Sequence, residues 1–132
     1  MAAGAGVAAA VPADRAIADA GPVIDKRIPS SGEALPAIGM GSYATFDVGT
    51  SEAERAPLRA VLKLFAGGGA RVIDTSPMYG RSEAVLGELL ASPHDAPRVF
   101  MATKVWTDGR QAGIEQIRRS MALLKVAALD LL

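Results

Sequence analysis

Short apolar segments alternate with helix-like segments along most of the chain. The apolar segments have the length of strands and fall at residues 37–42, 71–74, 99–106 and 128–132. The three segments between them carry apolar residues at the spacing of amphipathic helices. Strands that alternate with helices are typical of a parallel sheet joined by right-handed crossovers. The pattern alone fits either a doubly wound sheet or part of a (β/α)8 barrel.

The ends of the predicted elements carry turn and capping signals. Residues 27–37 read as two extended pieces around a glycine-containing turn, which predicts a hairpin ahead of the first parallel strand. Ser51 and Glu54 have the spacing of a capping box, but Pro57 suits a first helical position and would place the helix start beside it. Ser82 is placed to cap the second helix.

The composition is that of an ordinary globular protein and excludes several classes of function. Half of the 132 residues are hydrophobic, and 14 basic residues balance 14 acidic ones. The zero net charge gives no reason to expect nucleic-acid or membrane-surface binding, and no apolar run approaches the ~20 residues of a membrane span. The chain has no cysteine and one histidine, His94, so no metal site is expected.

Residues 1–24 differ from the rest because they are mostly small and have neither a helical nor a strand period. They read as a flexible tail or as the remnant of an export signal, with cleavage sites at residues 8–10 or 18–20. The absence of a basic residue before Arg15 counts against the signal. We slightly prefer export, and hence a periplasmic or exported location over a cytoplasmic one, because of a likeness described below. Residues 25–132 then form the folded unit.

Three residues with acid–base chemistry follow two of the predicted strands. Asp74 ends one strand, Tyr79 follows it five residues later, and Lys104 lies near the end of the next strand. The carboxyl ends of parallel strands meet at one edge, where barrel enzymes carry their chemistry. A lysine there needs a carboxylate to stay charged, and a cation beside a tyrosine favours loss of its proton. The three residues could therefore deliver a proton as one unit.

Each of these residues also has an ordinary structural explanation. Asp74 could make a turn with the polar residues that follow it, Tyr79 could be a loop tyrosine, and Lys104 could extend from a strand end into solvent. Trp106 could pack in the core nearly as well as line a pocket. It is the joint position of the first three that favours a catalytic site.

The motifs around these residues resemble those of the aldo-keto reductase family. That family carries Asp-Thr-Ala/Ser-x-x-Tyr-Gly after its second barrel strand and Thr/Ser-Lys after its third. Here residues 74–80 read Asp-Thr-Ser-Pro-Met-Tyr-Gly and residues 103–104 read Thr-Lys. The continuation at residues 81–87 and the opening at residues 28–41 are similar too. The opening, with the alanine-rich segment before it, resembles a bacterial subgroup that is exported with twin-arginine leaders.

The resemblance implies a fold and an activity. The fold is the N-terminal half of a (β/α)8 TIM barrel over residues 25–132, with an N-terminal β-hairpin, four parallel strands and three helices. The activity is the NADPH-dependent reduction of a small-molecule carbonyl substrate to an alcohol, with NADP(H) as the cofactor.

The resemblance also implies roles for individual residues. Tyr79 would protonate the developing alkoxide, Lys104 would favour release of that proton, and Asp74 would hold Lys104 charged and in place. The residues that correspond to the cofactor contacts are Gly41, Ser42, Tyr43 and Asp74, and the one that corresponds to a substrate contact is Trp106.

The family uses a further catalytic histidine, at the end of its fourth barrel strand, and this sequence has no counterpart. His94 lies in a polar loop instead. The chain is therefore expected to lack that histidine and the second half of the barrel. The alternative to an enzyme is an inactive truncated fragment or a non-catalytic assembly partner, and open strand edges predict self-association.

Overall fold

The computed structural model describes residues 23–91 and 98–132. Its centre is a parallel sheet of β3 (Met40–Gly41), β4 (Val72–Asp74) and β5 (Phe100–Ala102), in that order. Gly41 pairs with Asp74, and Asp74 pairs with Ala102, so the three strands end level with one another. The predicted parallel sheet is confirmed, and the residues that follow each strand emerge at one edge.

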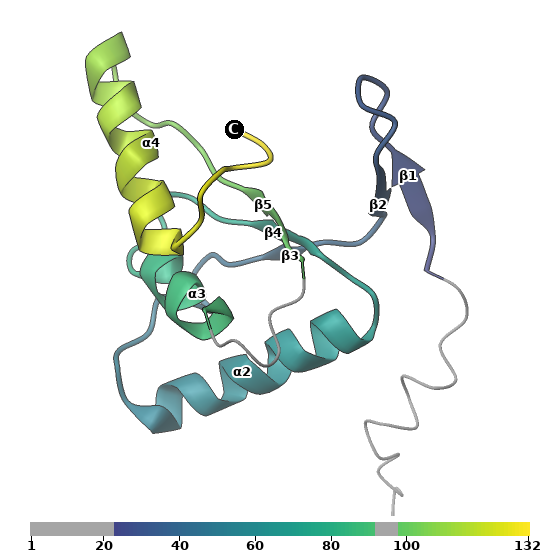
Figure 1. The fold of residues 1–132 in the computed structure, drawn as a ribbon. Coiled ribbons are helices and arrows are strands. Elements are labelled where there is room, and N and C mark those ends of the chain that lie inside the picture. Colours follow the sequence, from purple (N-terminus) through teal and green to yellow (C-terminus); the bar gives the residue numbers. More distant parts are fainter. Residues whose placement is uncertain (1–22, 92–97) are drawn as a thin grey trace, which may run out of the picture.

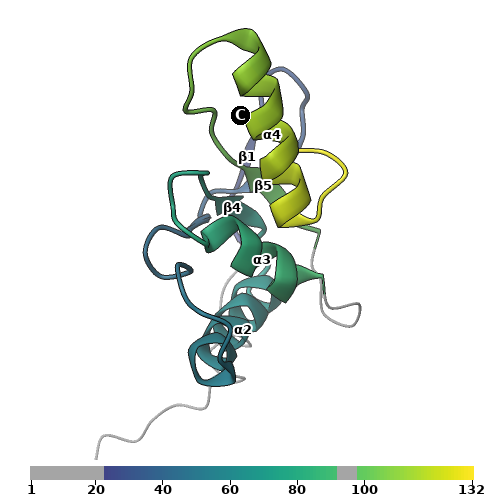
Figure 2. The same cartoon turned by 90° about the vertical axis from the view of Figure 1, so that its left-hand side faces the viewer.

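Three helices follow the three strands, as the sequence predicts. They are α2 (Glu52–Gly67), α3 (Ser82–Leu90) and α4 (Arg110–Leu124). Figure 1 shows the three helices around the sheet, away from the hairpin, and in Figure 2 they lie one above another in the order α4, α3, α2.

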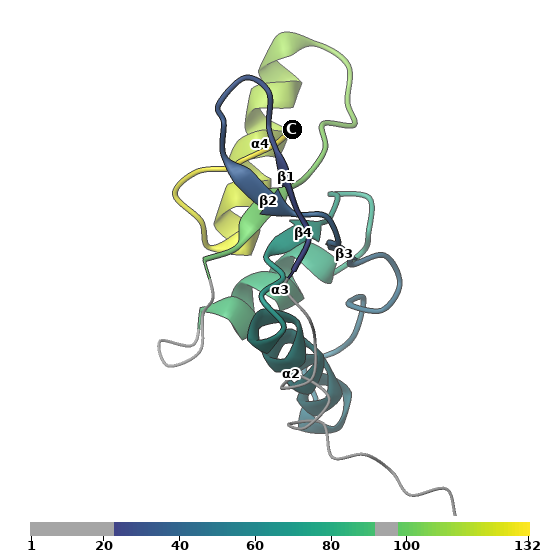
Figure 3. The same cartoon turned by 90° about the vertical axis from the view of Figure 1, so that its right-hand side faces the viewer.

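The predicted hairpin consists of β1 (Asp25–Arg27) and β2 (Ala34–Pro36), which pair antiparallel. Figure 3 views the molecule from the hairpin side, with the hairpin in front of the sheet. Arg71, just before β4, donates from Nη2 to the carbonyl oxygen of Ala34 at 2.6 Å and to Glu33 Oε1 at 3.0 Å. The hairpin is therefore fastened at the beginning of the strands, at the end opposite to Asp74.

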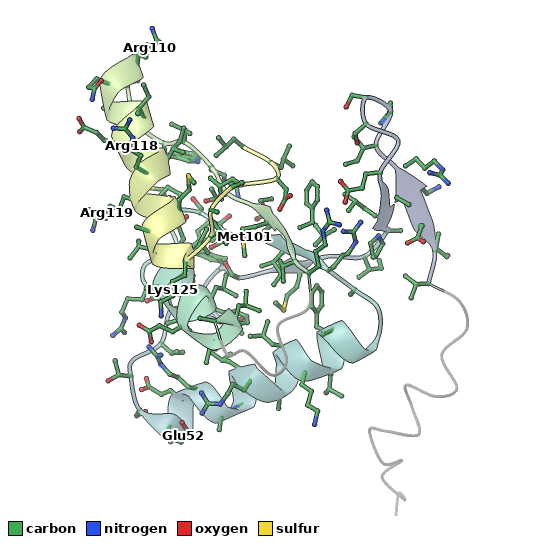
Figure 4. The ribbon with its side chains drawn as sticks, viewed as in Figure 1. Glu52, Met101, Arg110, Arg118, Arg119 and Lys125 are labelled. Carbon is green, nitrogen blue, oxygen red and sulfur yellow. The ribbon has the colours of Figure 1, made fainter. Side chains whose placement is uncertain are left out.

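The core lies between the sheet and the helices. Its buried apolar side chains come from all of them: Phe46, Leu58, Leu62, Ile73, Val85, Leu86, Met101 and Leu124. Figure 4 labels Met101 in the sheet, and Arg118 and Arg119 on α4. Both arginines are exposed, as expected for a solvated helix face.

Two details of the predicted helix starts are wrong. Helix α2 begins at Glu52 and not beside Pro57, which lies inside it, because Ser51 caps the helix by accepting a hydrogen bond from Glu54 N–H. Ser82 does not cap α3, whose N-cap residue is Arg81. The Ser82 hydroxyl is buried and donates to the carbonyl oxygen of Ser42 at 3.2 Å, so it links the start of α3 to the loop after β3 instead.

The predicted strands at residues 99–106 and 128–132 are also wrong in extent. Strand β5 ends at Ala102, and the second segment makes only a single parallel bridge, from Leu131 to Ala102. The described residues therefore hold three parallel strands where four were predicted. The pairing of this segment with β5 stops there because the Asp130 carboxylate, and not a backbone carbonyl, accepts the hydrogen bond of Met101 N–H at 2.8 Å.

Two sequence predictions fall outside the described residues. The alanine-rich leader lies almost wholly in residues 1–22, and His94 lies in residues 92–97. Among the helices of the described part, none is long and apolar enough to cross a membrane.

Candidate active site

The level ends of β4 and β5 bring Asp74 and Lys104 into contact. Lys104 Nζ donates to both carboxylate oxygens of Asp74 at 2.9 Å and to the carbonyl oxygen of Thr75 at 2.8 Å. A lysine ammonium has three N–H donors, so these acceptors fix its direction as well as its charge. The carboxylate and the ammonium that the sequence places at neighbouring strand ends form one ion pair.

Tyr79 lies beside this ion pair, in the loop that follows β4. Lys104 Nζ is 4.9 Å from the centre of the Tyr79 ring. The Tyr43 ring meets the Tyr79 ring edge to face, with 5.0 Å between the ring centres and 66° between the planes. The structure thus brings Asp74, Tyr79 and Lys104 together, as the motif spacing predicts, and adds Tyr43 as a packing neighbour.

The surroundings of Lys104 favour its charged form. Partial burial by itself would lower the pKa of Lys104, but the Asp74 carboxylate and then the Tyr79 oxygen act in the opposite direction. Their effect outweighs the burial, so the pKa of Lys104 lies above its ordinary value. A positive charge is therefore held beside Tyr79 throughout the neutral pH range.

Buried hydroxyls join the loop after β3 to the loop that carries Tyr79. Ser42 Oγ donates to Thr75 Oγ1 at 2.9 Å, and Ser82 Oγ donates to the Ser42 carbonyl oxygen at 3.2 Å. All three side chains are buried. Because each hydroxyl has a partner, the two loops are held in register at the edge of the sheet.

Asp47 fixes the residues that follow Tyr79. Its Oδ1 accepts a hydrogen bond from Arg81 N–H at 3.0 Å, and this backbone contact is the main cause that holds the pKa of Asp47 below its ordinary value. Gly80 has φ +57°, and a Cβ there would lie 2.3 Å from Asp47 Oδ2. The turn after Tyr79 therefore needs glycine.

An open cavity of about 280 Å³ adjoins the ion pair. It is lined by Tyr43, Ser76, Met78, Tyr79, Lys104 and Trp106. Trp106 is 64 % exposed and Tyr43 is 69 % exposed, so both rings stand in the cavity wall and not in the core. The cavity combines a mainly apolar wall with one ammonium group and the phenols of Tyr43 and Tyr79.

The remaining predicted site residues lie at the same edge but differ in accessibility. Gly41 ends β3, and a Cβ there would meet no atom within 4 Å. Ser42 is fully buried, and its backbone N–H and carbonyl oxygen are bonded to Asp74, Phe46 and Ser82, so this residue supports the edge from beneath. Within the described residues, no group of three or more histidine, cysteine, aspartate or glutamate side chains could hold a metal ion.

Sequence reasoning did not single out Asp47, Glu83 or Gln116 as functional. Asp47 and Gln116 are ordinary loop and helix residues with no local signal. Glu83 does carry one, because it precedes Leu86 and Leu90 at helical spacing and is thus a charged residue in an apolar stripe. That placement indicates a buried carboxylate with partners of its own.

Comparison with known proteins gives a consistent result. A family model described as "Aldo/keto reductase family" matches residues 37–132. The NADPH-dependent codeinone reductase 1-2 of Papaver somniferum is 32% identical over 110 residues, which cover 77% of this chain and 32% of that protein. The chain therefore spans about a third of the length of this curated relative.

Solved structures show the same likeness. An aldo/keto reductase from Klebsiella pneumoniae in complex with NADP and acetate is 30% identical, with a TM-score of 0.62, over 75% of this chain and 35% of that one. An aldo-keto reductase from Klebsiella pneumoniae in complex with NADPH is 30% identical, with a TM-score of 0.60, over 81% of this chain and 38% of that one.

Proposed function

Because the chain belongs to the aldo/keto reductase family, we propose that it carries the proton-donating site of an NADPH-dependent reduction of a carbonyl compound to an alcohol. The contact between Lys104 and Asp74 beside Tyr79, at the level ends of two parallel strands, is the observation that carries this proposal. The likeness to solved aldo-keto reductases supports a (β/α)8 barrel as the architecture to which the sheet belongs.

Tyr79 is the proton donor in this proposal. Its hydroxyl gives a proton to the carbonyl oxygen of the substrate as negative charge develops there, and a phenolate remains until solvent reprotonates it. The Lys104 ammonium, 4.9 Å from the ring centre, stabilises that phenolate electrostatically. Asp74 keeps the ammonium in place by accepting two of its hydrogen bonds.

The strand ends fit a nicotinamide cofactor, which supplies the hydride when it is bound. Gly41 leaves the end of β3 open to close approach, since a Cβ there would contact nothing within 4 Å. Tyr43 presents an exposed ring next to it, and Asp74 lies level with Gly41 in the neighbouring strand. We assign the cofactor contacts to these three residues, and Ser42, which is buried, supports the end of β3 beneath them.

The cavity wall supports an apolar carbonyl compound as the substrate. Met78 and Trp106 are exposed in the wall beside the ammonium and phenol, and such surfaces bind hydrophobic groups. Within the cavity, Lys104 is already neutralised by Asp74, so a second carboxylate on the substrate would gain little. We therefore propose uncharged aldehydes or ketones with an aromatic or aliphatic group.

The test of this function compares two lysine variants of the protein expressed from its natural gene. Lys104→Met keeps the length of the side chain and removes its charge, and it should lower NADPH-dependent alcohol formation at least ~10²-fold. Lys63→Met is the matched control, because Lys63 is exposed on α2, and it should leave the rate unchanged. Equal rates in both variants, or no alcohol from any uncharged carbonyl compound, would contradict the proposal.

A second candidate role is assembly, which we propose as the alternative to catalysis. The observation that favours it is exposed apolar surface near the sheet, where Ile38 is 76 % and Leu131 is 56 % exposed. Exposed apolar surface drives association. Sedimentation velocity should show self-association that Ile38→Ser weakens, whereas Leu64→Ser, on the outer part of α2, should not. A monomer at all concentrations would exclude this role.

The likeness of the N-terminal segment to exported, twin-arginine members of the family stays a prediction. Cell fractionation of the natural host followed by N-terminal sequencing would test it. A processed protein outside the cytoplasm would support export, and an unprocessed cytoplasmic one would exclude it.

A further inference from the structure

Glu83 is a buried carboxylate outside the catalytic cluster. It is 3 % exposed and lies in the first turn of α3. Its Oε1 accepts a hydrogen bond from Thr103 Oγ1 at 2.7 Å, and its Oε2 accepts one from Ser120 Oγ at 3.1 Å. Among the described residues, no cationic group pairs with it; the two hydroxyls are its partners.

Packing of α3 against α4 does not explain this carboxylate. The two helices already approach closely at Gly87, where a Cβ would lie 2.0 Å from the Leu123 carbonyl oxygen. Leu86 and Leu124 fill the contact with buried apolar side chains. An apolar residue at position 83 would serve that contact at a lower desolvation cost than a carboxylate.

The carboxylate adds a link to Thr103, the residue directly before Lys104. The last hydrogen bond of the β4–β5 ladder runs from Thr75 N–H to the Ala102 carbonyl oxygen at 2.9 Å. Beyond it, Thr103 N–H binds the Leu131 carbonyl oxygen at 3.1 Å, and the Thr103 hydroxyl binds Glu83. The Glu83 bond is thus the side-chain contact that orients the backbone from which Lys104 departs.

We propose that Glu83 is a positioning residue for Lys104, acting through the Thr103 hydroxyl. The inference rests on the proposed function for its kinetic consequence, but not for its geometric one. The Glu83–Thr103 bond sets the direction of the chain after β5, and so lets the ammonium reach both Asp74 oxygens and the Thr75 carbonyl at once. The Glu83–Ser120 bond anchors the carboxylate to α4 and has no part in this alignment.

The two hydroxyls provide a matched pair of variants. Thr103→Val and Ser120→Ala each remove one of the two hydroxyls that donate to the Glu83 carboxylate, and the other hydroxyl remains. Both variants should therefore lower the midpoint of thermal unfolding to a similar extent. Only Thr103→Val should lower kcat, by about 10- to 100-fold with little change in KM, because small misplacement of catalytic groups is costly. Thr103→Ser restores the hydroxyl and should restore kcat.

A second readout is independent of turnover. In protein labelled with ¹³C-lysine, the Cε resonance of Lys104 followed against pH reports its pKa, and Lys63 serves as the internal reference. Thr103→Val should move the pKa of Lys104 down towards its ordinary value because the contact with Asp74 loosens. Ser120→Ala and Thr103→Ser should leave the wild-type titration unchanged.

The outcomes separate the inference from the proposed function. If wild-type protein reduces no carbonyl compound but Thr103→Val alone shifts the Lys104 titration, the function fails and the positioning role stands. If Thr103→Val and Ser120→Ala give the same titration and the same kcat, Glu83 is only structural and the inference is overturned. The inference is also overturned if Thr103→Ser does not restore the kcat and the Lys104 titration of the wild-type protein.

Discussion

The loops after β4 and β5 both border the cavity, but they are held in different ways. The β4 loop carries Tyr79 and is fixed through the buried hydroxyls of Thr75 and Ser82 and through the carboxylate of Asp47. The β5 loop carries Trp106 beyond Lys104, and the contact that holds this outer part is the Gln116 side-chain amide. Trp106 N–H donates to Gln116 Oε1 at 2.6 Å, and Gln116 Nε2 donates to the Trp106 carbonyl oxygen at 3.4 Å.

The difference separates reaction chemistry from substrate selection. A proton donor must be placed to within fractions of an ångström, and the β4 loop achieves this with buried hydroxyl contacts together with the Asp47 carboxylate. A binding wall gains from adaptable contact with different ligands, and the exposed ring of Trp106 on a lightly held loop suits that purpose. Changes in the first loop should alter kcat, whereas changes around Trp106, in the part of the second loop beyond Lys104, should alter KM.

The largest effect is expected from a methyl group placed in the rigid loop. Gly80→Ala would strain the backbone at φ +57° and drive Cβ against Asp47. It should lower kcat by about 10²-fold and stability by ~1–2 kcal/mol. In α4, Gly113→Ala would make only an ordinary 3.5 Å contact with Val105 and should raise stability by up to ~1 kcal/mol. Chemical denaturation and kinetics of both variants measure the contrast, and a Gly80→Ala protein with wild-type kcat would break it.

Removal of the aromatic wall should act on binding. Trp106→Ala deletes an exposed ring of the cavity and should raise KM for aromatic aldehydes by about tenfold, equivalent to ~1.4 kcal/mol, with kcat nearly retained. Steady-state kinetics with an aromatic and a small aliphatic aldehyde would show whether the loss is confined to the larger substrate. A fall in kcat with unchanged KM would assign Trp106 to the chemistry instead.

A smaller effect is expected when the Gln116 contact with the Trp106 backbone is removed. Gln116→Ala breaks both hydrogen bonds to the Trp106 backbone but leaves the ring in the chain. KM should rise about threefold or less, since exposed hydrogen bonds contribute little net free energy. Gln111→Ala is the matched control, because the Gln111 side chain donates to Glu115 on the same helix and not to the β5 loop. If the two variants behave alike, Gln116 does not hold the wall.

The smallest effect is expected from protonation of Asp47 at acidic pH. The pKa of Asp47 is lowered in the folded protein, chiefly by the Arg81 N–H, so its stabilising contribution is present above the ordinary carboxyl pKa near ~3.9 and is lost as pH falls through the lowered folded value. The Arg81 amide resonance should therefore shift at acidic pH in wild-type protein. In Asp47→Asn that titration should be absent. An identical amide titration in both proteins would show that Asp47 does not hold the turn.

The sequence predicted those parts of the fold and site that depend on local patterns. Apolar periods gave the three helices, and the ends of the apolar runs placed Asp74 and Lys104 at one edge, because parallel strands end level. Contacts between side chains distant in the chain were not predicted. The Asp130 carboxylate accepts the hydrogen bond of Met101 N–H in β5, 29 residues before it in the chain. The Asp47 carboxylate accepts that of Arg81 N–H, 34 residues after it. Such contacts form only after the helices and strands pack, so no local pattern in the sequence predicts them.

The most direct test of the central claim compares the two tyrosine hydroxyls of this cavity. Tyr43 and Tyr79 have rings 5.0 Å apart, but the ammonium of Lys104 lies against Tyr79. With NADPH binding verified in both variants, Tyr79→Phe should lower kcat for carbonyl reduction at least ~10²-fold, whereas Tyr43→Phe, which keeps the ring contact, should lose less than about tenfold. Comparable kcat values for the two variants would contradict the assignment of Tyr79 as the proton donor.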